Sequence, residues 1–212
     1  MRIKTLVPTE KAAIVAAVVA AVAATHPEPA AACLHTALFA LRAIQARGLR
    51  AILQAGTMNW PILAEAEDCG DPLQPTHFSY QWEDREEAAF ALLKRRQPRM
   101  RGLLCLPELH VWAAIPETGE LVDLTTRYLP AQAARRAGLR WTAPLPPDVL
   151  WVTAAEMPPR VQYIPSRQAT ELVVYYLAAA GLLQPGDITP PPGSGAAPPP
   201  PSTVSPLARE DA

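Results

Sequence analysis

The segment from residue 110 to residue 126 places the strongest local constraint on the fold. Residues 110–115 and 120–126 have the length and apolar patterning of two strands, and Pro116-Glu117-Thr118-Gly119 between them has the composition of a turn. The sequence therefore predicts a β-hairpin here, which requires an antiparallel sheet in the fold.

The register of this hairpin decides which side chains share a face of the sheet. If Ile115 pairs with Glu120, Asp123 lies on the same face as His110, diagonal to it and within reach of its ring. A three-residue turn that paired Pro116 with Glu120 would turn Asp123 to the opposite face. A contact between His110 and Asp123 therefore depends on the first register.

Helical spacing of apolar residues predicts helices on both sides of the hairpin. Residues 12–24 carry an apolar face with Thr9 as the expected N-cap, and residues 34–44 carry another that ends before Gly48. Ser166 is the expected cap of a helix that continues to residue 181. The sequence also predicts strands at 50–57, 78–82, 149–152 and 160–164, a helix at 83–96 and a loop at 59–76. The expected class is α+β.

Composition divides the 212 residues into one domain and a tail. We expect a single domain over residues 1–183, with an N-terminal helix region at 1–27. From residue 184 the chain consists mainly of Pro, Gly, Ser and Ala, so residues 184–212 are expected to be a disordered or extended tail. An alternative role for the tail is a polyproline ligand at residues 198–201.

The N-terminus has three possible interpretations. Arg2, Lys4 and Lys11 precede the alanine-rich run, as in a signal segment, but that run is too short to span a bilayer. We expect a packed first helix, no stable membrane span and a cytoplasmic protein. The alternatives are export, with residues 2–24 as the signal, and a lipoprotein in which Cys33 is modified.

Charge and cysteine usage exclude several classes of protein. The net charge of −1 provides no basic surface for nucleic acid. Three cysteines without a C-x-x-C pair argue against a disulfide framework and a structural zinc site. Phosphate loops and dinucleotide fingerprints are absent from the sequence, so we expect no metal and no cofactor.

Cys33 is the first residue of the second predicted helix, and it fits two different roles, a nucleophile or a packed core residue. A helix N-terminus favours a thiolate, which is the nucleophilic form, and its unpaired N–H groups can bind an oxyanion. Taken alone, Cys33 also fits a small buried hydrophobe. His110 as a base, oriented by Asp123, would complete a thiol site.

The remaining candidates are less specific. His77 is a rival base. Aromatic residues near the predicted strands are expected to form core or cleft walls and are the candidates for substrate binding: Trp112, Trp82 and Tyr80. Four residues are possible oxyanion donors: Gln54, Asn59, Gln81 and Tyr80.

These motifs together resemble the transglutaminase-like superfamily of papain-type cysteine enzymes. The resemblance covers residues 28–127 and rests on Cys33 at a helix start, the Gly-Leu-Arg-Ala entry to a strand at 48–51, His110-Val111-Trp112, and Asp123 after Gly119. It is closest to bacterial transglutaminase-like proteins, including the leader-cleaving proteases of lasso-peptide maturation. Ala32 and the long gap between the cysteine and the histidine depart from the family pattern.

The resemblance implies a papain-like or transglutaminase-like fold, with N-terminal helices and a cysteine-led helix packed on an antiparallel sheet. It implies Cys33 as nucleophile, His110 as base and Asp123 as the residue that orients the base. The expected function is a thiol-dependent peptidase, amidase or acyltransferase with a peptide or protein substrate. The alternative is a catalytically inactive interaction module on the same fold, whose Pro-rich tail binds a partner.

Overall fold

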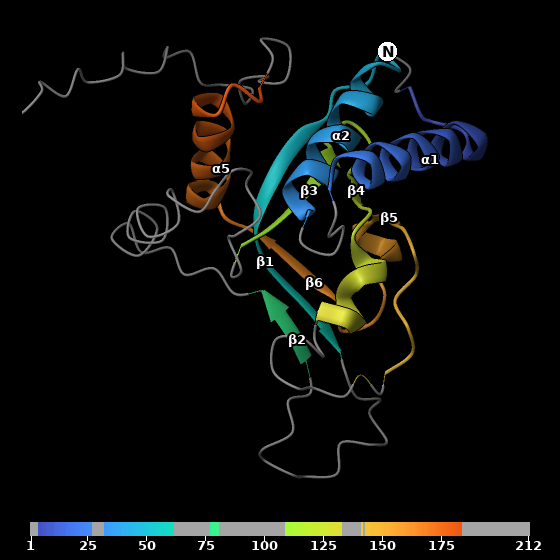
Figure 1. The fold of residues 1–212 in the computed structure, drawn as a ribbon. Coiled ribbons are helices and arrows are strands. Elements are labelled where there is room, and N and C mark those ends of the chain that lie inside the picture. Colours follow the sequence, from blue (N-terminus) through green and yellow to red (C-terminus); the bar gives the residue numbers. More distant parts are fainter. Residues whose placement is uncertain are drawn as a thin grey trace, which may run out of the picture.

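The computed structural model describes residues 4–26, 32–61, 77–80, 109–132, 141 and 143–183. Within these ranges the chain forms an α+β fold of helices on a curled antiparallel sheet (Figure 1). The helices are α1 (Pro8–Thr25), α2 (Cys33–Gln45) and α5 (Arg167–Ala179), with short 3-10 turns η4 (Thr126–Tyr128) and η5 (Ala154–Glu156). The strands are β1 (Ile52–Pro61), β2 (His77–Tyr80), β3 (His110–Ile115), β4 (Glu120–Asp123), β5 (Leu150–Thr153) and β6 (Gln162–Pro165).

Several predictions fall on residues outside these ranges. They are the helix at 83–96, the tail at 184–212, and the candidate residues Gln81 and Trp82.

The long strand β1 organises the sheet. The strand order is β2-β1-β3-β4-β5, and β6 also pairs with β1, so β1 has three antiparallel partners. Asn59 pairs with Ser79 of β2 and with Gln162 of β6. These pairings extend the strand to Pro61, so the prediction of a loop from residue 59 is wrong for its first three residues. Proline is tolerated there because the strand ends at that residue.

The hairpin between β3 and β4 has the register that the His110–Asp123 contact requires. Ile115 pairs with Glu120 across a four-residue turn. The N–H groups of Thr118 and Gly119 donate to the Ile115 carbonyl at 3.2 and 2.9 Å. Gly119 has a φ of 68°, in the left-handed region that glycine adopts readily. The predicted turn is confirmed.

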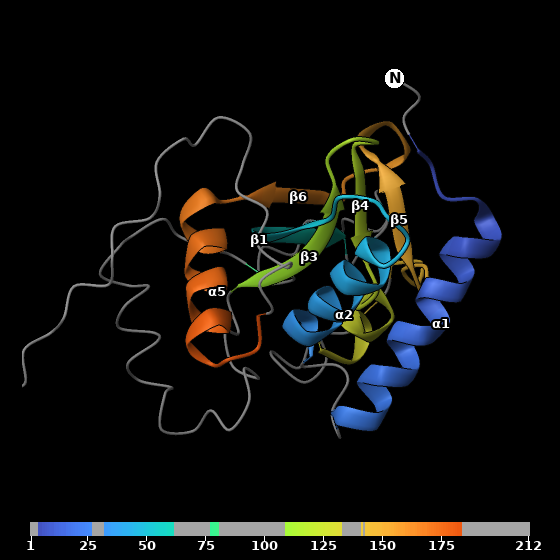
Figure 2. The ribbon, with the colours of Figure 1, turned by 90° about the horizontal axis from the view of Figure 1, so that it is seen from above.

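The three helices cover one face of the sheet and share its main core. Figure 2 shows α5, α2 and α1 next to one another along that face, with α2 in the middle. Side chains of β3 and β4 that point toward the helices pack against α2 in this core: Val111, Ala113, Ile115 and Val122, with Leu38, Leu41 and Ile44. His110, Trp112 and Asp123 therefore project from the opposite face of the sheet.

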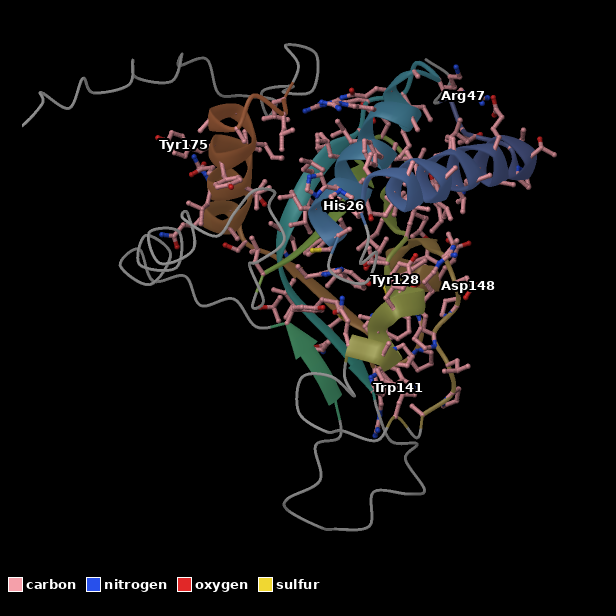
Figure 3. The ribbon with its side chains drawn as sticks, in the orientation of Figure 1. His26, Arg47, Tyr128, Trp141, Asp148 and Tyr175 are labelled. Carbon is pink, nitrogen blue, oxygen red and sulfur yellow. The ribbon has the colours of Figure 1, made fainter. Side chains whose placement is uncertain are left out.

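Helix α1 is attached to the core along one narrow stripe. Ile14, Val18 and Val22 are buried, whereas most of its other residues are wholly or partly exposed. Arg47, just after α2, lies 3.8 Å from Glu10 in the first turn of α1 (Figure 3). Among the residues that the structure describes, α1 is the one helix long and apolar enough to cross a membrane, a composition that also fits a core helix or a signal segment.

The start of α1 differs from the prediction. Its N-cap is Val7, not Thr9, and Pro8 occupies the first turn, where its missing N–H has no cost. The Glu10 carboxylate accepts a hydrogen bond from the Val7 N–H at 3.0 Å, so an acidic side chain replaces the hydroxyl cap. By contrast, Ser166 caps α5 as predicted, accepting from the Ala169 N–H at 3.0 Å.

Gly56 allows β6 and the start of α5 to lie close to β1. A Cβ at Gly56 would be 2.2 Å from the Ile164 carbonyl oxygen and 2.8 Å from the Ser166 nitrogen. The same region is held by a hydrogen bond from the Ser166 N–H to the Ala55 carbonyl at 2.8 Å. Both obstructing atoms belong to the backbone, so a larger residue can be accommodated only if β6 moves.

We therefore expect Gly56→Ala to lower the free energy of unfolding by about 2–3 kcal/mol, the cost of overpacking a site that cannot relax. Denaturant unfolding measures the loss. Gly119→Asn is the control, since no atom lies within 4 Å of a Cβ there and Asn tolerates a positive φ, so a loss below about 1 kcal/mol is expected. Equal losses in the two variants would contradict the close approach of β6.

Candidate active site

His110 and Asp123 form a buried pair at the centre of the candidate site. His110 is the first residue of β3 and Asp123 the last residue of β4. The Nε2 atom of His110 lies 2.6 Å from Oδ2 of Asp123, and each side chain is 1% exposed. The predicted pairing of the two residues across the hairpin is confirmed. A carboxylate on one ring nitrogen fixes the orientation and tautomer of the imidazole.

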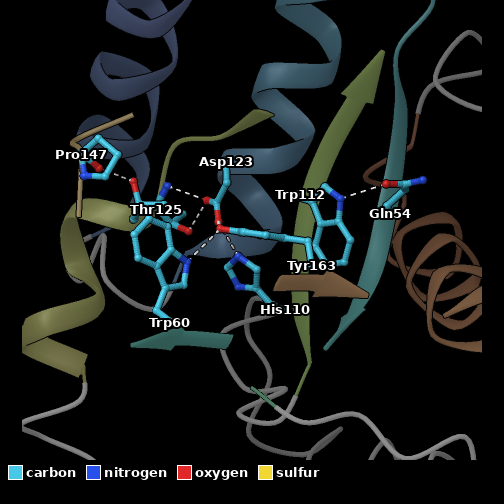
Figure 4. Close-up of polar contacts among 9 residues, drawn as sticks. Gln54, Trp60, His110, Trp112, Asp123, Thr125, Pro147 and Tyr163 are labelled. Atoms are coloured by element: carbon cyan, nitrogen blue, oxygen red, sulfur yellow. Dashed lines mark hydrogen bonds and ion pairs between the residues drawn. The ribbon is translucent and has the colours of Figure 1, made fainter. Parts of the chain in front are cut away.

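Asp123 accepts three more hydrogen bonds (Figure 4). The backbone N–H and the hydroxyl of Thr125 both donate to Oδ1, at 2.8 and 2.6 Å. The Tyr163 hydroxyl donates to Oδ2 at 2.6 Å, beside His110. Both carboxylate oxygens are thus saturated, which offsets the cost of removing this charge from water.

Cys33 lies in the neighbourhood of the His110–Asp123 pair. It is the first residue of α2, partly buried, and its sulfur is free. Cys33 lies near enough to His110 to contribute to the raised pKa of the imidazole, and its contribution favours the imidazolium. Nε2 is bound to Asp123, and Nδ1 is buried with no hydrogen-bond partner, so Nδ1 is the nitrogen left for the thiol.

Burial and the neighbouring carboxylate act in opposite directions on His110. Burial disfavours the charged imidazolium, but the charge and hydrogen bond of Asp123, aided by Cys33, prevail and raise the pKa of His110 to about 10. Burial likewise opposes the ionised form of Asp123, yet contacts with His110, Thr125 and Tyr163 lower the pKa of this carboxyl. The two residues therefore form an imidazolium–carboxylate pair near neutral pH.

Two aromatic residues predicted to lie at the site flank the imidazole. The Tyr80 ring stacks on His110 with centroids 5.1 Å apart, and the Trp112 ring lies 6.0 Å away. Both are buried, so they contribute packing, while their role in substrate binding stays a prediction. The Trp112 indole N–H donates to Oε1 of Gln54 at 2.9 Å, which turns the amide nitrogen of Gln54 away from Trp112.

Asn59 and His35 contact residues outside this cluster. Asn59 donates to the Gln162 side chain at 3.2 Å. His35 packs against His26, with ring centroids 4.0 Å apart, and burial and the second imidazole lower its pKa to about 4. His77 begins β2, but its side chain lies outside the part that the structure describes. Within the described ranges, no group of three or more His, Cys, Asp or Glu side chains is placed to hold a metal ion.

The prediction from sequence missed Tyr163, Thr125 and Trp60. Tyr163 was part of a predicted strand, but a tyrosine in a strand carries no signal of its partner. Thr125 lies two residues after Asp123, a spacing at which an Asp side chain often accepts hydrogen bonds from the backbone. That spacing was a signal that the sequence contained.

No protein-family model matches this chain, and comparisons with curated proteins and with solved structures find no similar protein. The geometry of the site is therefore the observation that bears on function.

The raised pKa of His110 predicts how stability changes with pH. Its pKa when unfolded is 6.5, so between that value and about 10 the folded protein binds about one more proton than the unfolded chain. The stabilisation is complete below pH 6.5 and is lost as the pH rises to about 10. We expect the free energy of unfolding to fall over this range, and Asp123→Asn to reduce the slope.

Urea unfolding at a series of pH values measures this slope. Asp148→Asn is the matched control, because Asp148 is exposed and its substitution should leave the slope unchanged. If the free energy of unfolding falls as steeply with pH in Asp123→Asn as in the unsubstituted protein, the His110–Asp123 pair is not the cause of the pH dependence.

Proposed function

We propose that the protein is a thiol-dependent enzyme that acts on amide or acyl bonds through Cys33, His110 and Asp123. The observation that carries the proposal is the buried His110, held by Asp123 on Nε2 while its other ring nitrogen is left for the free thiol of Cys33. A nucleophile, a base and a group that orients the base are the components of cysteine hydrolases and acyltransferases.

The first chemical step forms a thioester. The Cys33 thiolate attacks the substrate carbonyl carbon, and the carbonyl electron pair moves to oxygen. The first N–H groups of α2 have no helical partners, and Ala32 provides no side-chain cap for them. These donors can stabilise the oxyanion. When the tetrahedral intermediate collapses, the C–N bond breaks and the leaving amine takes a proton from the His110 imidazolium.

The second step releases the acyl group. His110, now neutral, takes a proton from water or from an acceptor amine, which attacks the thioester carbonyl. The C–S bond breaks, the thiolate of Cys33 returns, and the product is a carboxylic acid or a new amide. The negative charge of Asp123 stabilises the imidazolium that forms in this step. We propose a peptide or protein as the substrate.

The proposed fold class is papain-like or transglutaminase-like. Two features support it: α2 begins at the cysteine and packs on the sheet, and the histidine and aspartate come from adjacent antiparallel strands. Fold alone does not establish activity, so the test must address the thiol directly.

Site-specific alkylation with iodoacetamide tests the proposed nucleophile without knowledge of the substrate. We expect Cys33 in the folded protein to react at about pH 7 at least roughly tenfold faster than Cys33 in His110→Gln, because loss of the imidazolium removes the support for the thiolate. Mass spectrometry of the modified peptides separates Cys33 from Cys69 and Cys105.

Asp123→Asn should also slow the reaction, and Asp148→Asn, which changes an exposed carboxylate, should not. Far-UV circular dichroism establishes that each variant is folded. If Cys33 reacts at the same rate with and without His110, the enzyme proposal fails and the catalytically inactive interaction module becomes the better explanation.

We propose that α1 is part of the folded domain and that the protein acts in the cytoplasm. The support is the burial of Ile14, Val18 and Val22 in the core shared with α2 and α5. The competing hypothesis is removal of the segment during export.

Val18→Ala should then lower the free energy of unfolding by about 1–2 kcal/mol, because it removes buried apolar atoms from the core. Val19→Ala is the matched control, since Val19 is only partly buried, and its effect should be smaller. Intact mass measurement of the protein from its native cytosol should show that α1 is retained. A chain that lacks α1 would contradict the proposal.

A further inference from the structure

We propose that Tyr163 is a positioning residue for this site, whose hydroxyl holds Asp123 and thereby the His110 imidazole in place. This inference rests on the proposed function, and it assigns a role to a strand, β6, that lies far from the hairpin in sequence.

The hydrogen bonds to the Asp123 carboxylate are divided between its two oxygens. Thr125 supplies both donors to Oδ1, and Tyr163 supplies the donor to Oδ2 beside His110. A carboxylate can rotate about its Cβ–Cγ bond, and donors on both oxygens fix its plane. Without Tyr163, Oδ2 would keep His110 as its sole partner, and the angle of the His110–Asp123 hydrogen bond would depend on Thr125 alone.

Tyr163 is itself held in place by several contacts. The Trp60 indole N–H donates to the Tyr163 hydroxyl oxygen at 3.3 Å, which aims the tyrosine proton at Asp123. The Trp112 ring meets Tyr163 edge to face, with centroids 5.2 Å apart. Figure 4 shows the tyrosine between Asp123 and Trp112, with its hydroxyl at the carboxylate. A donor fixed in this way loses little entropy when it binds its acceptor.

The close approach of β6 to β1 brings Tyr163 to the site. Tyr163 pairs with Met58 of β1, and the absence of a side chain at Gly56 allows the neighbouring residues of β6 to contact β1. Met58 lies on the same face of the sheet as His110, because Gly56 pairs with His110 and side chains alternate along a strand. The backbone arrangement therefore directs Tyr163 into the site.

The charge state of Tyr163 suits this role. Burial, and then the negative charge and hydrogen bond of Asp123, raise the pKa of Tyr163 well above its usual value. The hydroxyl therefore stays a neutral donor throughout the physiological range. Among the described residues, the titratable groups that face His110 are Cys33 of α2, Tyr80 of β2, Asp123 of β4 and Tyr163 of β6.

The test compares Tyr163→Phe with Tyr175→Phe in the full chain. Tyr175 is 68% exposed and lies on α5 away from the sheet (Figure 3), so the control makes the same chemical change outside the site. Two quantities are measured for each: the titration midpoint of His110 by NMR of the imidazole, and the rate of Cys33 alkylation by iodoacetamide.

We expect Tyr163→Phe to lower the His110 midpoint by about one pH unit, because a carboxylate that is held through Oδ1 alone is less well aligned with the ring and stabilises the imidazolium less well. Cys33 alkylation at about pH 7 should become roughly tenfold slower. Tyr175→Phe should change neither quantity. Trp60→Phe, which removes the donor to Tyr163 and leaves the hydroxyl, should produce a smaller shift of the midpoint in the same direction.

The two measurements separate this inference from the proposed function. A His110 midpoint that does not move in Tyr163→Phe would overturn the positioning role, whatever the reactivity of the thiol. A midpoint that moves as expected, together with Cys33 alkylation that is insensitive to His110→Gln, would support the positioning role and overturn the proposed enzyme. If Tyr163→Phe is poorly folded, Trp60→Phe is the second variant. It removes the donor that aims the Tyr163 hydroxyl, and a His110 midpoint that does not move in it would overturn the positioning role.

Discussion

The buried contact between His110 and Asp123 sets requirements that the surrounding structure has to meet. Two groups that carry opposite charges lose their hydration when they are buried, and their mutual attraction compensates only when the remaining hydrogen-bonding positions are also satisfied. Here Thr125 and Tyr163 supply the missing donors to the carboxylate. On the histidine, Nδ1 has no hydrogen-bond partner and is left for Cys33. The proposed chemistry takes place at this nitrogen.

These requirements connect parts of the fold that are distant in sequence. The hairpin register places His110 and Asp123 on one face, and β6 brings Tyr163 to the same carboxylate through its pairing with β1. Helix α2 packs on the other face of the sheet, and its first residue, Cys33, interacts with His110 at the start of β3. The helix core and the polar cluster thus occupy opposite faces of the same strands, and α2 connects them.

Local signals predicted several of these elements well. The Pro-Glu-Thr-Gly turn predicted the hairpin and left two registers open, and the structure has the register that pairs Ile115 with Glu120. Register determines the face of each side chain. Ser166 was identified as a helix cap, since its hydroxyl serves an N–H three residues away. The prediction of Thr9 as a cap was wrong because proline at residue 8 starts the helix earlier, and a cap depends on where the first turn begins.

Other features depended on residues far away in the chain. The extension of β1 through Asn59 results from pairing with β2 and β6, for which the local composition, rich in turn-forming residues, provides no signal. The roles of Tyr163 and Trp60 depend on the same pairing. The sequence by itself determined the helix that starts at Cys33 and the hairpin at residues 110–123, because both follow from periodicity and turn chemistry over short distances. It left open the register that joins His110 to Asp123. Only the tertiary structure decided that Gly56 admits β6 and that Tyr163 completes the carboxylate, because close packing between distant strands has no periodic signature in the chain.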